Sequence, residues 1–132
     1  LAVHHVSNIH WCCVAVVFGE TPTMYYYDSL KDMTLGDPGL AFERMSDFLE
    51  TEWQRQQCPT SFPTFNKVRQ AVCPQQNNGV DCGMFSIEVA RALALAPDFH
   101  APDFSFTQGD ISRLRAELAI EIVLSSALQP DN

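Results

Sequence analysis

Residues 74–86 read Pro74-Gln75-Gln76-Asn77-Asn78-Gly79-Val80-Asp81-Cys82-Gly83-Met84-Phe85-Ser86, a polar loop that leads into an apolar segment. The pair Asn78-Gly79 is typical of a turn, because glycine adopts positive φ without steric penalty. Asp81 is a favourable residue for the N-cap of a helix. Beyond Cys82, apolar residues recur at spacings of four, four and three, the pattern of one helix face: Phe85, Val89, Leu93 and Ala96. The sequence therefore predicts a helix that begins at Cys82.

The predicted helix places Cys82 in its first turn, where backbone N–H groups lack partners and the helix dipole is positive. This position favours a thiolate over a thiol, so Cys82 is a candidate nucleophile. Gln76 precedes Cys82 by six residues, and a loop of that length can return its side-chain amide to the sulfur. The Gln76 amide and the Cys82 backbone N–H would then bind a developing oxyanion. The alternative is a structural cysteine, buried at the start of a core helix.

The composition bounds the class of protein. With 132 residues, 46% of them hydrophobic and 18% charged, the chain is expected to form one globular domain. The net charge of −8 argues against a nucleic-acid-binding surface and would suit a partner with a basic patch. No apolar run approaches the roughly 20 residues of a transmembrane helix, and the start has no basic region of a signal peptide.

The cysteines indicate a reducing environment. There are five of them, so at least one is unpaired: Cys12, Cys13, Cys58, Cys73 and Cys82. No C-x-x-C motif occurs, and the His and Cys spacings match no common zinc pattern. We therefore expect reduced thiols in an intracellular protein, nuclear or cytoplasmic. The chain opens within an apolar–polar pattern rather than on Met, so it is expected to be a fragment.

Two paired strands are predicted before residue 30. Residues 12–18 form a continuous apolar run with β-branched content, which indicates a buried central strand. After a turn at residues 19–22, the aromatic run of residues 24–27 indicates its antiparallel partner. Residues 1–7 alternate as an edge strand would. Because His10 enters the first strand of the pair and Asp28 leaves the second, these two residues should lie side by side.

An Asp beside a His fixes the tautomer of the ring through Nδ1 and stabilises the imidazolium. His10 and Asp28 are therefore a candidate acid–base pair. Taken singly, each has a plainer interpretation, a strand-end histidine and a turn residue. The other histidines, His4, His5 and His100, are weaker candidates: the first two are neighbours on a strand, and the third lies in a Pro-rich loop.

Further elements follow from capping signals and spacing. Asp37 and Pro38 predict the start of a helix that runs to about Gln57, with a stripe expected to be core: Leu40, Phe42, Met45, Phe48, Leu49 and Trp53. Residues 65–72 are predicted as a third strand. Residues 107–110 resemble a capping box, and the helix after them should end near Leu128 and bury one face: Ile111, Leu114, Leu118 and Ile122.

Three motifs occur in a defined order: His10-Trp11, then Tyr26-Tyr27-Asp28-Ser29, then Pro74-Gln75-Gln76-x-Asn78-Gly79-x-Asp81-Cys82-Gly83-Met84-Phe85. In this order the chain resembles the ubiquitin-like-protein-specific cysteine proteases, the Ulp or SUMO/sentrin-specific protease family. The tail, Phe106-Thr107-Gln108-x-Asp110-Ile111 with Glu121-Ile122, resembles the last helix of that family. The resemblance covers nearly all of the chain. Cys12-Cys13 stand where the family more often has Ser-Leu or similar, and they are expected to be packing residues.

The resemblance implies a papain-like cysteine protease fold of the Ulp and adenain type. This is an α+β fold with a short mixed or antiparallel central sheet and the nucleophile at the N-terminus of a buried helix. Cys82 would attack the carbonyl, His10 would move the proton, and Asp28 would orient His10. Gln76 and the Cys82 N–H would stabilise the oxyanion.

The resemblance also implies a substrate. Trp11 would form one wall of a tunnel that admits only glycine, and Gln75 and Gly83 are the further substrate-binding candidates. The implied activity is cleavage after the C-terminal Gly-Gly of a ubiquitin-like modifier, SUMO foremost, in deconjugation, precursor processing or both. No metal and no cofactor are implied. The expected partners are the modifier and its conjugates, without nucleic acid or membrane, and the chain is expected to be a monomer.

Family members have further helices and a strand before the His-Trp motif, including a second tryptophan of the tunnel. Residues 1–132 are therefore expected to be a single catalytic domain, the C-terminal two-thirds or so of the family domain. Two alternatives remain open. One is a protease of the adenovirus type or a bacterial effector acetyltransferase with the same fold. The other is an inactive remnant or a modifier-binding module.

Overall fold

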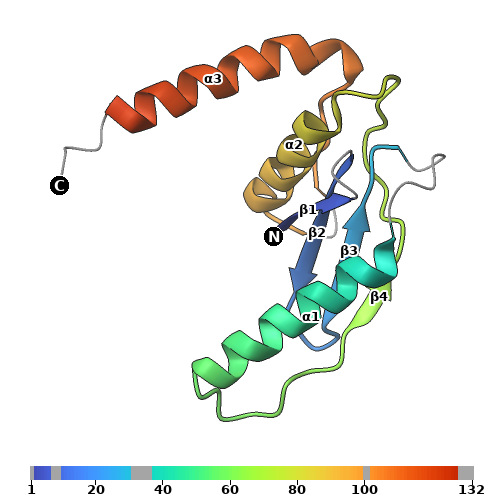
Figure 1. The fold of residues 1–132 in the computed structure, drawn as a ribbon, viewed down its shortest axis with the longest axis vertical. Coiled ribbons are helices and arrows are strands. Elements are labelled where there is room, and N and C mark those ends of the chain that lie inside the picture. Colours follow the sequence, from blue (N-terminus) through green and yellow to red (C-terminus); the bar gives the residue numbers. More distant parts are fainter. Residues whose placement is uncertain (1, 7–9, 31–36, 100–101, 128–132) are drawn as a thin grey trace.

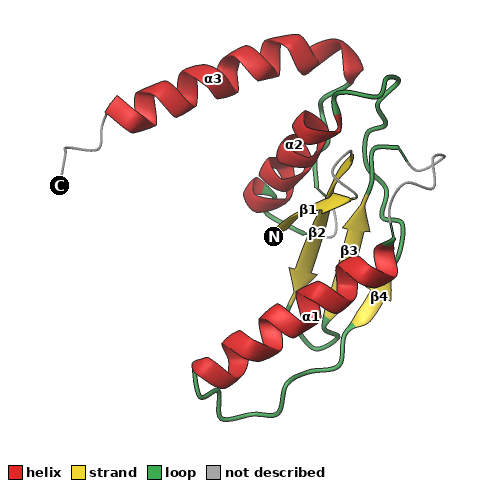
Figure 2. Cartoon of the chain, in the orientation of Figure 1, coloured by secondary structure: helices red, strands yellow, loops and turns green. Residues whose placement is uncertain are grey.

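The computed structural model describes residues 2–6, 10–30, 37–99 and 102–127 and shows an α+β fold, with helices around a small sheet (Figure 1). Within these residues four strands form one sheet in the order β1-β2-β3-β4 (Figure 2). The first three are antiparallel neighbours: β1 (Ala2–Val6), β2 (His10–Val17) and β3 (Thr23–Tyr27). β4 (Asn66–Val68) pairs with β3 in parallel. The sheet is therefore mixed, and the predicted edge strand and strand pair are confirmed.

β2 lies between two apolar layers, because its side chains alternate between the two faces of the sheet. Cys13 and Ala15 belong to one layer and Cys12 and Val14 to the other, and none of the four is more than 1% exposed. The prediction of a buried central strand is thus confirmed. The strand ends one residue earlier than predicted, and Phe18 is 51% exposed.

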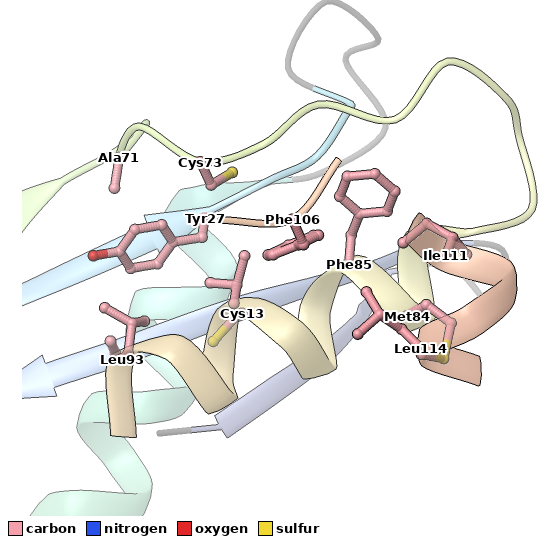
Figure 3. Packing of buried hydrophobic residues seen from close by; sticks show 12 residues of the cluster. Cys13, Tyr27, Ala71, Cys73, Met84, Phe85, Leu93, Phe106, Ile111 and Leu114 are labelled. Carbon is pink, nitrogen blue, oxygen red and sulfur yellow. The ribbon is translucent and has the colours of Figure 1, made fainter. Parts of the chain in front are cut away.

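The helix α2 (Cys82–Leu95) contributes to the first apolar layer and begins where the sequence predicts. Its predicted stripe is buried at Phe85, Val89 and Leu93, and Ala96 follows as the C-cap. Figure 3 shows side chains from α2 in one cluster with residues of the sheet and of the chain before α3. In this cluster the rings of Phe85 and Phe106 meet edge to face, with centroids 5.5 Å apart.

The helix α1 (Pro38–Arg55) contributes to the second layer. Its start is confirmed, because the Asp37 carboxylate accepts a hydrogen bond of 2.8 Å from the N–H of Gly39. Its end comes two residues before the predicted position. At that position Gln57 adopts a φ of 52°, which a continuing helix does not allow.

The apolar stripe of α1 is only partly core, which corrects the prediction. Phe42 is fully buried and its ring meets Tyr26 of β3 at 6.3 Å. By contrast, Phe48 is 61% exposed and Leu40 is 40% exposed. The helical geometry is the physical reason: Phe42, Met45 and Leu49, at spacings of three and four, share the face that packs on the layer, whereas Leu40 and Phe48 lie on either side of that face.

The predicted third strand over residues 65–72 is shorter than expected. Only Asn66–Val68 forms a strand, and all three side chains are exposed. The chain bends at Arg69 and Gln70, yet the N–H of Ala71 still donates to the carbonyl of Tyr26 at 2.8 Å. The segment therefore stays attached to β3 after the strand ends, and it carries the chain back toward Asp28.

The capping box at residues 107–110 is confirmed. It opens a short 3₁₀ helix, η1 (Gln108–Asp110), which continues as α3 (Ile111–Ala127). Ile111 and Leu114 are buried, but Ile122 is 58% exposed, so the predicted buried face covers only the first half of α3. Figure 1 shows the second half of α3 extending away from the sheet. Leu128 and the predicted end of the helix lie outside the described residues.

Candidate active site

His10 and Asp28 form a buried pair, as the sequence predicts. The ring nitrogen Nε2 of His10 lies 2.7 Å from Oδ1 of Asp28, and the two residues are 0% and 4% exposed. The nitrogen that faces Asp28 is Nε2, whereas the sequence-based expectation was Nδ1. The position explains the difference, because Asp28 lies just past the strand that pairs with β2, and the ring reaches it with its outer nitrogen.

The other ring nitrogen of His10 is available for chemistry. Nδ1 is buried and has no hydrogen-bond partner in the described part of the chain. When Nε2–H donates to the carboxylate, Nδ1 of the neutral ring carries a lone pair. A buried acceptor without a partner is costly, so such groups are concentrated where they have a task.

Asp28 is held in place from several sides. Its carboxylate accepts hydrogen bonds from the N–H of Leu30 at 2.8 Å and from the hydroxyl of Tyr26 at 3.5 Å. Burial raises the pKa of Tyr26, so this hydroxyl remains a donor at neutral pH. The Asp28 carbonyl accepts from the amide of Gln75 at 3.0 Å. Gln75, predicted to bind substrate, thus braces the turn that carries Asp28.

Cys82 lies at the start of α2 and is 5% exposed. This turn lies beside Trp11 of β2, because a Cβ on Gly83 would lie 3.7 Å from Cδ1 of the indole. The residues that follow His10 and Cys82 are therefore neighbours in space. Trp11 is 40% exposed, so its ring presents a surface beside the first turn of α2.

Asp81 occupies the N-cap position but does not cap the helix with its side chain, which corrects the prediction. Its carboxylate accepts instead from Asn78 Nδ2 at 2.7 Å, Gln108 Nε2 at 2.7 Å and Arg115 Nη2 at 2.6 Å. These hydrogen bonds, that from Asn78 foremost, lower the pKa of Asp81. Three side-chain donors, one of them charged, outcompete a backbone N–H.

The Asn78-Gly79 turn also differs from expectation, because none of the described glycines has positive φ. The turn is closed by a side chain. Asn78 Oδ1 accepts from the N–H groups of Val80 and Asp81 at 3.0 and 3.1 Å. An Asx-type turn of this kind needs no left-handed residue.

Gln76 is buried and tied to the residue after Asp28. The Ser29 hydroxyl donates to Gln76 Oε1 at 2.6 Å, and the N–H of Gln76 donates to the Ser29 carbonyl at 3.0 Å. The Gln76 amide nitrogen donates one N–H to the Asn78 carbonyl at 2.6 Å. An amide nitrogen carries two N–H groups, so a second one remains for another acceptor.

The remaining cysteines are unsuited to nucleophilic chemistry or lie elsewhere. All five cysteines lie in the described residues, and none of them forms a disulfide. Burial raises the pKa of Cys12 to about 11 and that of Cys13 to about 12, so both stay protonated at neutral pH. The thiol of Cys73 donates to the Asp28 carbonyl at 3.4 Å. Cys58 lies in the connection between α1 and β4. His100, a competing histidine, lies outside the described residues.

The described residues offer neither a metal-binding cluster nor a membrane-spanning helix. They contain no group of three or more His, Cys, Asp or Glu side chains that could hold a metal ion. Across the same ranges, none of the helices combines the length and apolar character that a membrane crossing requires. Ser29, Tyr26, Gln108 and Arg115 complete the site although spacing did not identify them. The motif around Asp28 and the capping box were the available signals for three of these, Tyr26, Ser29 and Gln108.

The α+β fold holds a buried His–Asp pair on β2 and β3, and the residue after the His lies beside the first turn of a cysteine-bearing helix, an arrangement of the class of proteins that carry His, Asp and Cys for thiol chemistry. The chain belongs to the Ulp1 protease family: the model of the C-terminal catalytic domain of that family matches residues 2–127.

Individual relatives agree with this assignment. The sentrin-specific protease 5 of Homo sapiens is 26% identical over 119 residues, which are 87% of this chain and 14% of the relative. The sentrin-specific protease 3 of Homo sapiens is 25% identical over 115 residues, or 87% of this chain and 18% of the relative. The chain thus spans less than one fifth of the length of these curated relatives.

Proposed function

We propose that the chain is a cysteine-type isopeptidase and endopeptidase domain, of papain-like fold, that cleaves after the C-terminal Gly-Gly of a ubiquitin-like modifier, SUMO foremost. One observation carries the proposal. His10 binds Asp28 through Nε2, its buried Nδ1 has no partner in the part of the chain that the structure describes, and the next residue, Trp11, lies beside the first turn of the Cys82 helix.

Cys82 is the nucleophile in this proposal, and His10 moves the proton. Nδ1 takes the proton of the thiol while Sγ forms a bond to the carbonyl carbon of the terminal glycine. The C–N bond then breaks, and the same nitrogen returns the proton to the leaving amine. Water, activated by His10, cleaves the thioester and releases the carboxylate and the free thiol. Asp28 keeps Nε2 protonated, and so keeps Nδ1 ready as the acceptor.

The oxyanion of each tetrahedral intermediate would be stabilised by the backbone N–H of Cys82 and the second N–H of Gln76. The Ser29 hydroxyl, bonded to Gln76 Oε1, supports this role because it holds the oxygen of that amide away from the oxyanion. Loss of one such donor costs about 10²- to 10³-fold in kcat in comparable hydrolases.

The Gly-Gly tail would cross the indole of Trp11 beside Gly83. The narrow space between ring and backbone selects residues that lack a Cβ, which accounts for a diglycine substrate. Names of relatives support the modifier class, since both compared proteins are sentrin-specific proteases. The net charge of −8 suits a modifier that presents a basic surface.

The decisive experiment compares two cysteine variants on a fluorogenic SUMO substrate, in which the fluorophore follows the Gly-Gly terminus. Cys82→Ser should lower turnover by at least about 10³-fold, because the nucleophile is lost. Cys58→Ser, a matched change outside the site, should leave turnover unchanged. Full activity in the Cys82 variant would refute the assignment.

A second measurement separates a protease from a module that only binds the modifier. SUMO with a C-terminal vinyl sulfone should form an adduct with the chain, and peptide mass spectrometry should locate it on Cys82. Binding of SUMO without an adduct would favour the modifier-binding module instead.

A further inference from the structure

The loop from Gln76 to Cys82 is closed by a single side chain from another part of the molecule. Gln108, the first residue of η1, accepts a hydrogen bond from the N–H of Asn77 through Oε1 at 3.0 Å. It donates to Oδ2 of Asp81 through Nε2 at 2.7 Å. One amide group therefore holds the residue after Gln76 and the residue before Cys82.

Gln108 is itself fixed by its surroundings. The residue before it, Thr107, donates two hydrogen bonds to the Asp110 carboxylate, one from its N–H and one from its hydroxyl, both at 2.9 Å. This capping box sets the backbone of η1, and the buried Ile111 anchors the helix that follows. The amide of Gln108 thus reaches the loop from a backbone that packing has already placed.

The bridge matters because the residues that it joins, Asn77 and Asp81, are the chain neighbours of Gln76 and Cys82. Gln76 is the proposed oxyanion donor, and Cys82 is the proposed nucleophile. Their separation is set by the path of the loop between them, and no regular secondary structure fixes that path. Hydrolases lose about 10²-fold in rate when a reacting group is displaced by roughly 1 Å. A clamp across both ends of the loop would prevent such a displacement.

We propose that Gln108 is a positioning residue that sets the distance between the oxyanion donor Gln76 and the nucleophile Cys82. The inference rests on the proposed function, and Arg115 assists through the other oxygen of Asp81. Gln108 acts through Asn77 and Asp81 and makes no contact with the substrate. Its loss should therefore lower kcat, which depends on the oxyanion site, and leave KM unchanged.

The test uses Gln108→Ala and Gln108→Met, the second of which keeps most of the side-chain volume and so guards against a folding failure. On the fluorogenic SUMO substrate, kcat should fall about 10- to 100-fold, with KM within a factor of two. Alkylation of Cys82 by iodoacetamide forms no oxyanion, so its rate should change by less than threefold. Gln54→Met is the matched control, because Gln54 is an exposed residue of α1 and lies outside the loop and the elements that hold it.

Either of two results would overturn the inference: an unchanged kcat in Gln108→Met, or equal losses in turnover and in alkylation, which would indicate general damage. If the parent chain shows no activity on SUMO, the proposed function is refuted. Amide hydrogen exchange then still tests whether Gln108 holds the loop. The Asn77 amide should exchange at least about tenfold faster in Gln108→Met, and an unchanged rate would show that the bridge holds nothing.

Discussion

The orientation of one imidazole ring determines what the site can do. Because Nε2 of His10 is bound to Asp28, the proposed base acts through Nδ1, which is buried and has no partner within the described ranges. The hydroxyl of Tyr26 and the N–H of Leu30 keep the carboxylate in place. Loss of the carboxylate charge would remove both the orientation of the ring and the stabilisation of the imidazolium.

Asp28→Asn should therefore lower kcat/KM by about 10²- to 10⁴-fold while the fold is retained. The amide can present either its oxygen or its nitrogen to the ring, so the productive tautomer is no longer enforced. Turnover of the SUMO substrate is the measurement. Asp47→Asn, an exposed change on α1, is the control and should be neutral. Activity within threefold of the parent in Asp28→Asn would contradict the role assigned to this carboxylate.

At the scale of elements, α2 does two things at once: its first turn carries the candidate nucleophile, and its apolar face packs on the sheet. Phe85 is fully buried one turn after Cys82, and its ring meets that of Phe106. The position of the sulfur relative to His10 thus depends on how this face packs, since both elements are rigid on the scale of a hydrogen bond.

Phe85→Ala should lower the free energy of unfolding by about 3–5 kcal/mol, because a large buried ring is replaced by a cavity. Urea denaturation followed by circular dichroism would measure the change. Val80→Ala, at a side chain that is 79% exposed, should change stability by less than about 0.5 kcal/mol. Equal effects of the two substitutions would show that α2 does not rest on this ring.

Local patterns predicted the elements well and their contacts poorly. The helix from Cys82 and the meeting of His10 with Asp28 follow from spacing and strand pairing, which are properties of neighbouring residues. The side-chain role of Asp81 could not be predicted in this way, because its partners Gln108 and Arg115 lie 27 and 34 residues further along the chain. Such contacts depend on how the elements are packed, which no local pattern specifies.

The same limit explains why the apolar stripe of α3 is partly exposed. Periodicity shows which face of α3 is apolar, but the layer beneath it determines how much of that face is covered. Ile122 of α3 fits the period of Ile111, Leu114 and Leu118 and is still 58% exposed. The length of the layer beneath a helix is a property of the whole fold.

At the scale of the whole molecule, Asp81 links the loop before α2 to α3. The hydrogen bonds from Asn78, Gln108 and Arg115 lower its pKa below the ordinary value of 3.8. A carboxyl with a depressed pKa contributes stability that is present above its ordinary pKa and is lost as the pH falls through the lowered value. Acid should therefore release α3 from the loop.

Asp81→Asn should consequently lower the melting temperature at pH 7, and the difference from the parent should shrink as the pH falls below about 4. Thermal unfolding measured from pH 7 to pH 3 would test this. Asp103→Asn, at an exposed residue, is the control and should give a constant offset. A difference that stays constant across this range would contradict the link.

The exposed connection after α1 divides the proposed machinery in two. Residues before it carry His10 and Asp28, and residues after it carry Gln76 and Cys82. A protein cut within residues 56–61 would separate base from nucleophile into two inert pieces. Fused to a pair of interacting partners, those pieces would regain proteolysis only on association, so the chain has the layout of a split reporter.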